Sequence, residues 1–221
     1  DLYRACDLQG LPAETAISEF GPGQLEITLH HRADALRALD EGVMFRRLIK
    51  GIAQKHGYIA CFMAKPFADS GGNGLHIHTS VYDGQGNNVF ADPNSTAVPP
   101  LSSMFRHAIG GMAATMAESM AIFAPNANSY RRFQPGNYVP LSPSWGYNHR
   151  DVSLRIPVSS PSNLRIEHRV AGADANPYLV TAAVLAGIHH GITHQCDPGP
   201  MIDEGTRMVD QQATLPNRWE W

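Results

Sequence analysis

The chain has 221 residues, of which 43% are hydrophobic, and a formal charge of −3 at pH 7. A chain of this size and composition can bury a substantial core in one large domain or two small ones, which excludes the disordered and fibrous classes. The absence of any run of about 18 apolar residues disfavours a membrane span, and the slightly acidic charge supplies no basic stripe for nucleic acid.

Hydrophobic periodicity and turn residues predict the secondary structure. Strands are expected at 24–31, 58–64, 75–83 and 163–170, and helices at 33–56, 101–123 and 176–190. Gly57 closes the first helix, and Asn176 and Pro177 form an N-cap and first-turn pair that opens the last one. Strands and helices in mixed order, with several hairpin signals, predict an α+β architecture with an antiparallel-rich sheet and flanking helices.

Several other features have a structural interpretation. The helix at 101–123 carries four methionines, interpreted as core filler rather than as a soft-metal site: Met104, Met112, Met116 and Met120. Three histidines near the end of the last helix suit its dipole better than a metal site: His189, His190 and His194. The proline-rich loops at 92–100 and 135–143 are too short to be linkers and are expected to close over a site.

The cysteines and histidines bear on compartment and metal binding. Cys6, Cys61 and Cys196 are widely spaced and form no C-x-x-C pair. This spacing disfavours a disulfide framework and a thiolate zinc site, and it favours a reducing compartment, so the chain is expected to be cytoplasmic. The 11 histidines motivate a search for metal ligands without establishing a site.

Residues 72–80, GNGLHIHTS, place two histidines one residue apart after a glycine-rich turn. In a strand His76, His78 and Ser80 share one face, while the apolar residues between them share the other. An isolated H-x-H is either an ordinary surface strand or part of a site, and the motif alone does not decide.

Two further stretches gather charge. In EFGPGQLE, Glu19 and Glu26 flank a tight turn, where two carboxylates repel each other unless a divalent cation lies between them or both are solvated. In NLRIEHRV, one strand face carries Arg165, Glu167 and Arg169, which is either a salt-bridge ladder or an active-site wall with one metal ligand and two anion clamps.

Residues 129–157 add three more arginines, Arg132, Arg150 and Arg155. Arginines gathered with carboxylates and a histidine are what phosphoryl transfer requires. The chain has no Walker A sequence, no G-x-G-x-x-G after a strand and no G-x-S-x-G, so nucleotide chemistry here would need a different fold.

These segments together resemble the catalytic domain of glutamine synthetases. The resemblance rests on EFGPGQLE, FMAKPFADSGGNGLHIHTS, NSYRRFQP, the following W-G-x-x-x-R and R-I-P, and LRIEHRVAGADANPYL, which occur in the family's order. It implies that residues 1–221 are a glutamine synthetase-like catalytic domain. The N-terminal β-grasp domain, an upstream E-x-E strand that completes the metal site, and the C-terminal end are expected outside this chain.

The resemblance also implies roles for individual residues. Glu19 and Glu26 match ligands of the metal nearer glutamate, and His76 and Glu167 match ligands of the metal that bridges the ATP phosphates. Arg150 matches a residue facing the transferred phosphate. The positions that match the nucleotide site are Glu14, His78, Ser80, Arg155 and Arg165, and those that match the glutamate site are Gly72, Arg132 and Arg169.

The implied reaction uses glutamate, ATP, two magnesium or manganese ions, and an amine or ammonium. The γ-carboxylate of glutamate takes the γ-phosphoryl group of ATP, and a nitrogen nucleophile then displaces phosphate. The family's members form hexameric rings, in which the N-terminal domain of one subunit closes the site of the next, so two stacked rings are expected.

Several positions depart from the family pattern, and two of them bear on the substrates. Tyr138 stands where ammonia-using members carry a glutamate that binds ammonium, and Gly71 replaces an asparagine. A phenol stays protonated at neutral pH and cannot act as that carboxylate, but its ring can pack along an alkyl chain and its face can attract an ammonium group. The sequence therefore favours a γ-glutamyl amine ligase. The alternatives are an ammonia-using glutamine synthetase in which another acid replaces the missing one, a non-catalytic relative, and a zinc hydrolase.

Overall fold

The computed structural model describes residues 1–136, 138–203, 205–206 and 214–216. The helices are α1 (Leu2–Gln9), α2 (Ala35–Lys55), α3 (Ser103–Thr115), α4 (Met120–Phe123), α5 (Ala127–Tyr130), a 3-10 turn η1 (Pro161–Asn163) and α6 (Pro177–His194). The strands are β1 (Ala13–Ser18), β2 (Leu25–Leu29), β3 (Ile77–Thr79), β4 (Trp145–Tyr147), β5 (Leu154–Ile156) and β6 (Ile166–His168). No helix in these described ranges is long and apolar enough to cross a membrane.

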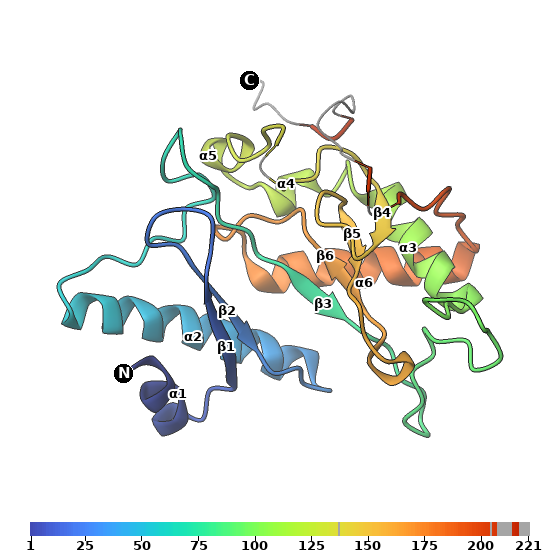
Figure 1. Ribbon diagram of the computed structural model, residues 1–221, viewed down its shortest axis with the longest axis horizontal. Helices are drawn as coiled ribbons and strands as arrows, with labels where there is room; N and C mark the ends of the chain where they lie inside the picture. The colour runs from blue at the N-terminus through green and yellow to red at the C-terminus, as the bar shows by residue number, and fades with distance from the viewer. Residues whose placement is uncertain (137, 204, 207–213, 217–221) are drawn as a thin grey trace.

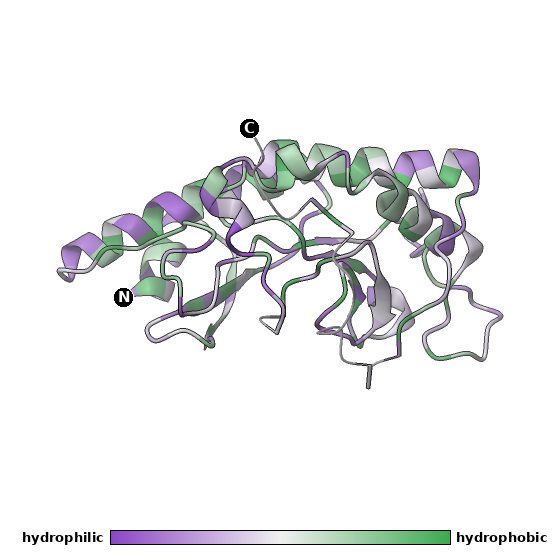
Figure 2. Cartoon of the chain, turned by 90° about the horizontal axis from the view of Figure 1, so that it is seen from above, coloured by the Kyte–Doolittle hydropathy of each residue, from purple (hydrophilic) through white to green (hydrophobic). Residues whose placement is uncertain are grey.

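The strands form two separate sheets. β1 and β2 make an antiparallel hairpin, and the other four strands follow the order β3-β6-β5-β4, in which only the β4–β5 pair is parallel. In Figure 1, α3 and α6 lie behind the four-stranded sheet and the hairpin lies beside α2. Figure 2 shows the long helices along one side of the molecule, with strands and loops on the other. This arrangement confirms the predicted antiparallel-rich α+β fold.

Each sheet has its own hydrophobic core. The larger core lies between the four-stranded sheet and helices α3 and α6, and it includes Phe105, Ile109, Leu154, Ile166 and Val184. The smaller core packs the hairpin against α1 and α2 through Cys6, Leu11 and Phe45, with Ile27 and Leu29 on the hairpin side. One face of each sheet is therefore buried, which leaves the other face free to carry polar groups.

Helices α3 and α6 approach each other at glycines. A Cβ atom built on Gly191 would overlap the backbone carbonyl oxygen of His107, and one built on Gly111 would overlap the backbone of Gly187 and Gly191. The two helices therefore come closer here than any residue with a side chain would permit.

Three predicted elements are confirmed with small changes in their ends. The strand at 24–31 is β2, and the helix at 33–56 is α2, which begins after the Asp34 cap and is followed by Gly57 at φ 76°. The last helix is α6, where the Asn176 side chain accepts a hydrogen bond from the backbone N–H of Tyr178 at 3.0 Å. It runs to His194, so the three histidines lie within the helix; the rings of His190 and His194 are 4.5 Å apart.

The strand predicted at 58–64 is wrong. This segment has no regular structure, and Ile59 is 94% exposed. Its last carbonyl groups accept hydrogen bonds from a loop residue rather than from a strand. The Asn73 side chain donates to the carbonyl of Met63, and the Asn73 backbone N–H donates to the carbonyl of Ala64. Apolar residues alone did not provide the partner strand that a sheet requires.

The helix predicted at 101–123 is divided into α3 and α4. The side-chain hydroxyl of Thr115 donates to the carbonyl of Gly111, and that of Ser119 donates to the carbonyl of Thr115. Such bonds compete with the helical pattern, which explains the interruption between the two helices. Three of the four methionines are buried as predicted, but Met104 is exposed.

The strands predicted at 75–83 and 163–170 are shorter than expected, with three residues each in β3 and β6. Beyond their ends, isolated bridges pair Gly74 with Gly172 and Tyr82 with Asn88. The three central residue pairs between β3 and β6 are still formed, and they include His78 opposite Glu167.

Candidate active site

The polar face of the four-stranded sheet carries the predicted charged residues. His78 of β3 and Arg155 of β5 are both directly opposite Glu167 of β6, so the three side chains share one face. His76, Arg165 and Arg169 lie two positions away and share it. The buried residues Ile166 and Leu154 and the partly buried Ile77 lie on the opposite face, toward the larger core. The predicted alternation of polar and apolar faces is confirmed.

Glu167 is the centre of this face. It is only 2% exposed, and its Oε2 accepts a hydrogen bond from Arg155 Nη1 at 2.8 Å. Its Oε1 accepts from Arg169 and lies 3.2 Å from His76 Nδ1. Burial by itself would raise the pKa of Glu167, but the hydrogen bond from His76 and the charge of Arg169 outweigh it and hold that pKa well below the usual range. The carboxylate is therefore anionic at neutral pH.

His76 is neutral in this environment. Burial is the largest cause that lowers its pKa, to about 4, and the nearby Arg169 adds to the effect. Because Glu167 is a carboxylate, the hydrogen of the neutral ring is on Nδ1, where it is donated to Oε1. This tautomer leaves the lone pair on Nε2, the arrangement of a histidine that binds a metal with support from a neighbouring acid.

His168 is a buried residue for which the sequence predicted no role. It lies on the core face of β6, its ring is 4.5 Å from that of Phe123, and neither ring nitrogen has a hydrogen-bond partner among the described residues. Burial is the largest of the causes that lower its pKa to about 3, followed by His76 and the charge of Arg132. His168 is therefore a neutral packing residue, and only its place in the alternation indicated this.

The residues expected to hold glutamate lie together. Arg132 is buried and donates to the backbone carbonyls of Val170 at 2.7 Å and Arg169 at 3.2 Å. A Cβ on Gly72 would lie 2.9 Å from Arg132 Cγ and 2.6 Å from the carbonyl oxygen of Ala64, so only glycine fits at this position. Burial lowers the pKa of Arg132 to about 10, with the charge of Arg169 as the next cause, and the side chain stays charged at neutral pH.

A glutamine that the sequence reasoning missed joins the hairpin to this loop. The backbone N–H of Glu19 donates to the carbonyl of Gln24 at 2.9 Å, which closes the turn. The Gln24 side chain donates to the carbonyl of Gly72 at 2.9 Å and to Asn73 Oδ1 at 2.7 Å. The available signal was an amide side chain between two glutamates in a tight turn.

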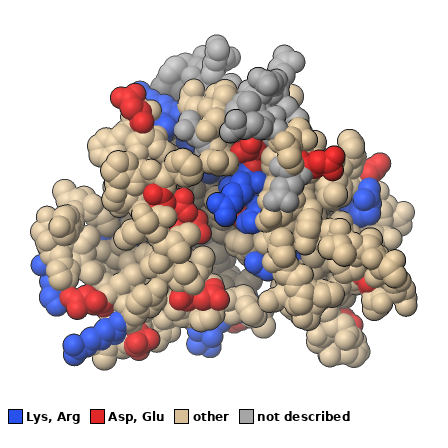
Figure 3. Space-filling view, viewed as in Figure 1, with Lys and Arg blue, Asp and Glu red and all other residues tan. Residues whose placement is uncertain are grey.

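The hairpin places its carboxylates near the sheet's polar face. Burial raises the pKa of Glu26, and the carboxylates of Glu19 and Glu167 raise it further, while Arg169 and Arg150 lower it. Acidic side chains of the hairpin therefore interact electrostatically with charged side chains of the sheet and the loop before β5. Figure 3 shows red and blue groups on opposite sides of a central hollow. Arg150 is exposed on the loop before β5.

The residues expected at the nucleotide divide between the two sheets. Arg165 Nε donates to His78 Nδ1 at 3.2 Å, and Arg155 Nη2 donates to Asn148 Oδ1 at 2.9 Å, while Ser80 follows β3 directly. Glu14 lies on β1, where Thr28 Oγ1 is 3.5 Å from its carboxylate and His30 Nδ1 is 3.6 Å away. The four-stranded sheet thus brings together four of the five residues.

The metal ligands expected from the sequence are present as two pairs. Within the described ranges, no three His, Cys, Asp or Glu side chains form a metal site by themselves. Glu19 and Glu26 flank the hairpin turn, and His76 and Glu167 are in contact on the sheet. Hard oxygens with a single imidazole fit magnesium or manganese rather than zinc, and a cation between the carboxylates would offset the repulsion felt by Glu26. Further ligands would have to come from substrate, water or other parts of the protein.

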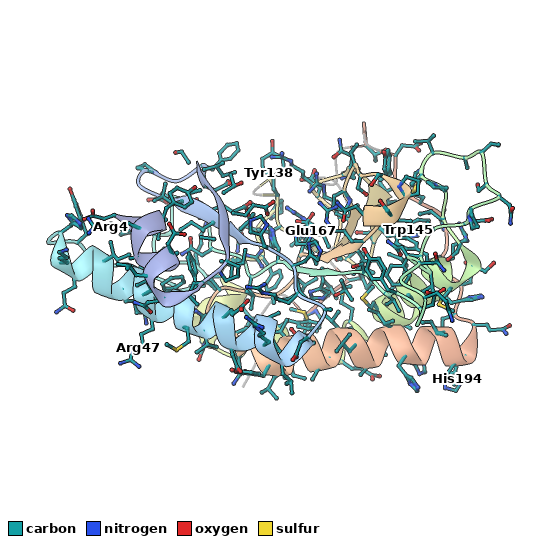
Figure 4. All side chains as sticks on the ribbon, turned by 90° about the horizontal axis from the view of Figure 1, so that it is seen from below. Arg4, Arg47, Tyr138, Trp145, Glu167 and His194 are labelled. Carbon is teal, nitrogen blue, oxygen red and sulfur yellow. The ribbon has the colours of Figure 1, made fainter. Side chains whose placement is uncertain are left out.

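Tyr138 lies at the edge of the site. Its backbone is left-handed at φ 53°, its side chain is 44% exposed, and its ring centroid is 5.5 Å from that of Phe20. Figure 4 places it on the side of the strands away from the long helices, with Glu167 between. Tyr138 therefore lies against the hairpin turn, whereas the loop at 92–100 lies at the other end of the molecule in Figure 1.

The chain is similar in sequence and structure to several known proteins. The family model described as glutamine synthetase, catalytic domain, matches residues 1–220. The chain is 48% identical over 216 residues to γ-glutamylputrescine synthetase PuuA of Escherichia coli strain K12, covering 98% of this chain and 44% of that protein. It is 42% identical over 207 residues to the glutamate–isopropylamine ligase of a Pseudomonas species, covering 94% and 44%.

A solved structure of apo GmaS without ligand superposes with a TM-score of 0.83 at 32% identity, covering 96% of this chain and 49% of that one. The chain thus spans less than half the length of each of these three proteins.

Proposed function

Because the chain belongs to the glutamine synthetase family, as the match of its catalytic-domain model over residues 1–220 shows, we propose that it is part of an ATP-dependent ligase that joins the γ-carboxyl group of glutamate to an organic amine. The observation that carries the choice of amine is Tyr138, an aromatic residue at the edge of the site where an ammonium-binding carboxylate is expected. Both curated relatives described above are named for organic amines, putrescine and isopropylamine.

In the proposed reaction, glutamate and ATP bind on opposite sides of Glu167. Gly72, Arg132 and Arg169 would hold glutamate, and the nucleotide would lie against His78, Ser80, Arg155 and Arg165, with Glu14 approaching from the hairpin. When bound by Glu19 and Glu26 and by His76 and Glu167, two divalent cations would neutralise phosphate charge. Arg150 would stabilise the transferred phosphoryl group, and the arginines would do so for both transition states.

The acceptor must attack γ-glutamyl phosphate as a neutral nitrogen. A site for ammonium needs an anionic group that collects the cation and removes a proton. A tyrosine at position 138 supplies no such charge at neutral pH, but it offers an apolar ring to the carbon chain of an amine. The second candidate function is an ammonia-using glutamine synthetase, which is supported only by membership of the same family.

A ratio of specificity constants tests this proposal. In the full-length enzyme we expect kcat/KM for putrescine or a monoamine to exceed that for ammonium, and Tyr138→Glu to shift the ratio toward ammonium by roughly tenfold or more, since a carboxylate restores an ionic partner. Tyr138→Phe is the matched control and should keep the preference for the amine. If the unaltered enzyme prefers ammonium, the protein is a glutamine synthetase with an unusual loop.

We also infer that the active enzyme is a ring oligomer of two stacked hexamers. The apolar residues Tyr58, Ile59 and Phe67 are exposed on this chain, and exposed apolar groups of this size are typical of surfaces that bind another protein. Light scattering on the full-length protein should give a mass of about twelve subunits. A fully active monomer would contradict this inference.

A further inference from the structure

Phe20 is an exposed aromatic residue directly beside the predicted metal ligand Glu19. Its side chain is 79% exposed, although a phenylalanine ring gains more from burial than almost any other side chain. The ring is not isolated, because its centroid lies 5.5 Å from that of Tyr138, with 50° between the planes. Two aromatic residues that are 118 positions apart in the chain are thus held next to each other at the edge of a charged site.

The position of Phe20 is fixed by the turn that follows it. The backbone N–H of Gly21 donates to Gln24 Oε1 at 3.0 Å, while the Gln24 amide group donates to the loop at Gly72 and Asn73. The same loop carries Gly72 against Arg132, where glutamate is expected. The turn that follows Phe20 is therefore hydrogen-bonded, through the Gln24 side chain, to the loop that would hold the substrate.

Gly71 leaves space on this side of the ring. A Cβ on Gly71 would lie 3.9 Å from Phe20 Cβ and 3.3 Å from Gln24 Oε1. A longer side chain at position 71 would have to displace either the ring or the amide that holds the turn. The two departures noted in the sequence, Gly71 and Tyr138, thus both lie beside Phe20.

We infer that Phe20 is a specificity-determining residue which, together with Tyr138, forms an aromatic wall for the hydrocarbon chain of a primary alkylamine. This inference rests on the proposed function, because it concerns the acceptor of that reaction. The wall is apolar, exposed and adjacent to carboxylates, so the chain of an amine can lie along the rings while its nitrogen reaches the charged site. Ammonium has no carbon chain and gains nothing from such a surface.

The test is the dependence of kcat/KM on chain length. The full-length enzyme is assayed with glutamate, ATP and ammonium, methylamine, n-propylamine or n-pentylamine, and phosphate release is measured. For the unaltered enzyme we expect kcat/KM to rise by about threefold to fourfold per methylene that the wall covers. Phe20→Ala should flatten this rise, so that n-pentylamine loses roughly tenfold or more relative to methylamine.

Two variants control for the loss of structure. Phe20→Tyr and Tyr138→Phe keep both rings and should keep the rise with chain length. Since Phe20 is mostly exposed, Phe20→Ala should leave the thermal midpoint of unfolding unchanged. The double variant Phe20→Ala, Tyr138→Ala should lose less than the sum of the two single losses, because the two rings act on one chain.

The outcomes separate the inference from the proposed function. If Phe20→Ala retains the full rise with chain length, or lowers all amines and ammonium by one common factor, Phe20 does not recognise the chain and the inference fails while the amine ligase stands. A flat profile in an unaltered enzyme that still prefers amines overturns the inference in the same way. If the unaltered enzyme prefers ammonium over every amine, the proposed function fails first.

Discussion

Replacing Glu167 by alanine should reduce phosphate release from ATP by on the order of a thousandfold or more in the full-length enzyme. The substitution removes one hard ligand from a predicted metal site, and it leaves Arg155 and Arg169 without the carboxylate that binds both of them. It also removes the acceptor that sets the tautomer of His76. Glu167→Gln keeps the shape of the side chain and should lose nearly as much activity, because the charge is lost.

Glu41 offers a matched control for this experiment. It is also a buried glutamate bound by two arginines, with Arg32 Nε at 2.8 Å and Arg37 Nε at 3.0 Å, but it lies on α2, which packs against the smaller core. Glu41→Ala should therefore lower thermal stability and leave kcat within a few-fold of the unaltered value. Near-normal phosphate release by Glu167→Ala would show that the polar face of β6 has been assigned wrongly.

The second large effect concerns stability, at the contact between α3 and α6. Gly191→Ala places a Cβ against the backbone carbonyl of His107, and a backbone group between two packed helices cannot rotate away as a side chain can. We expect a loss of about 3 kcal/mol or more in the free energy of unfolding. The thermal midpoint should fall by about 6 to 12 °C, measured by calorimetry or circular dichroism.

Gly51 is the matched control, because it also lies inside a long helix, α2, but a Cβ there would meet nothing within 4 Å. Gly51→Ala should stabilise the protein by about 0.5 to 1 kcal/mol, since alanine loses less conformational freedom in a helix than glycine does. Opposite signs at the two positions would confirm that close packing, rather than helix propensity, selects glycine at 191. Equal effects would contradict it.

Local patterns in the sequence were sufficient for part of the fold. The alternation around His76, His78 and Glu167 indicated which side chains share a face, because the period of a strand is two residues whatever it pairs with. The cap Asn176 marked the start of the last helix, since an unpaired backbone N–H needs an acceptor close in the chain. At these positions, residues of the element itself supply the decisive interaction.

The sequence by itself determined the family, the alternating faces of β3 and β6, and the residue types available to the site. Only the tertiary structure decided that Gln24 joins the hairpin to the Gly72 loop and that Phe20 meets Tyr138. It also left 58–64 without a partner strand, against the local pattern. The physical reason is that these contacts join segments distant in the chain, so their occurrence depends on how the whole chain packs and leaves no periodic signal near either residue.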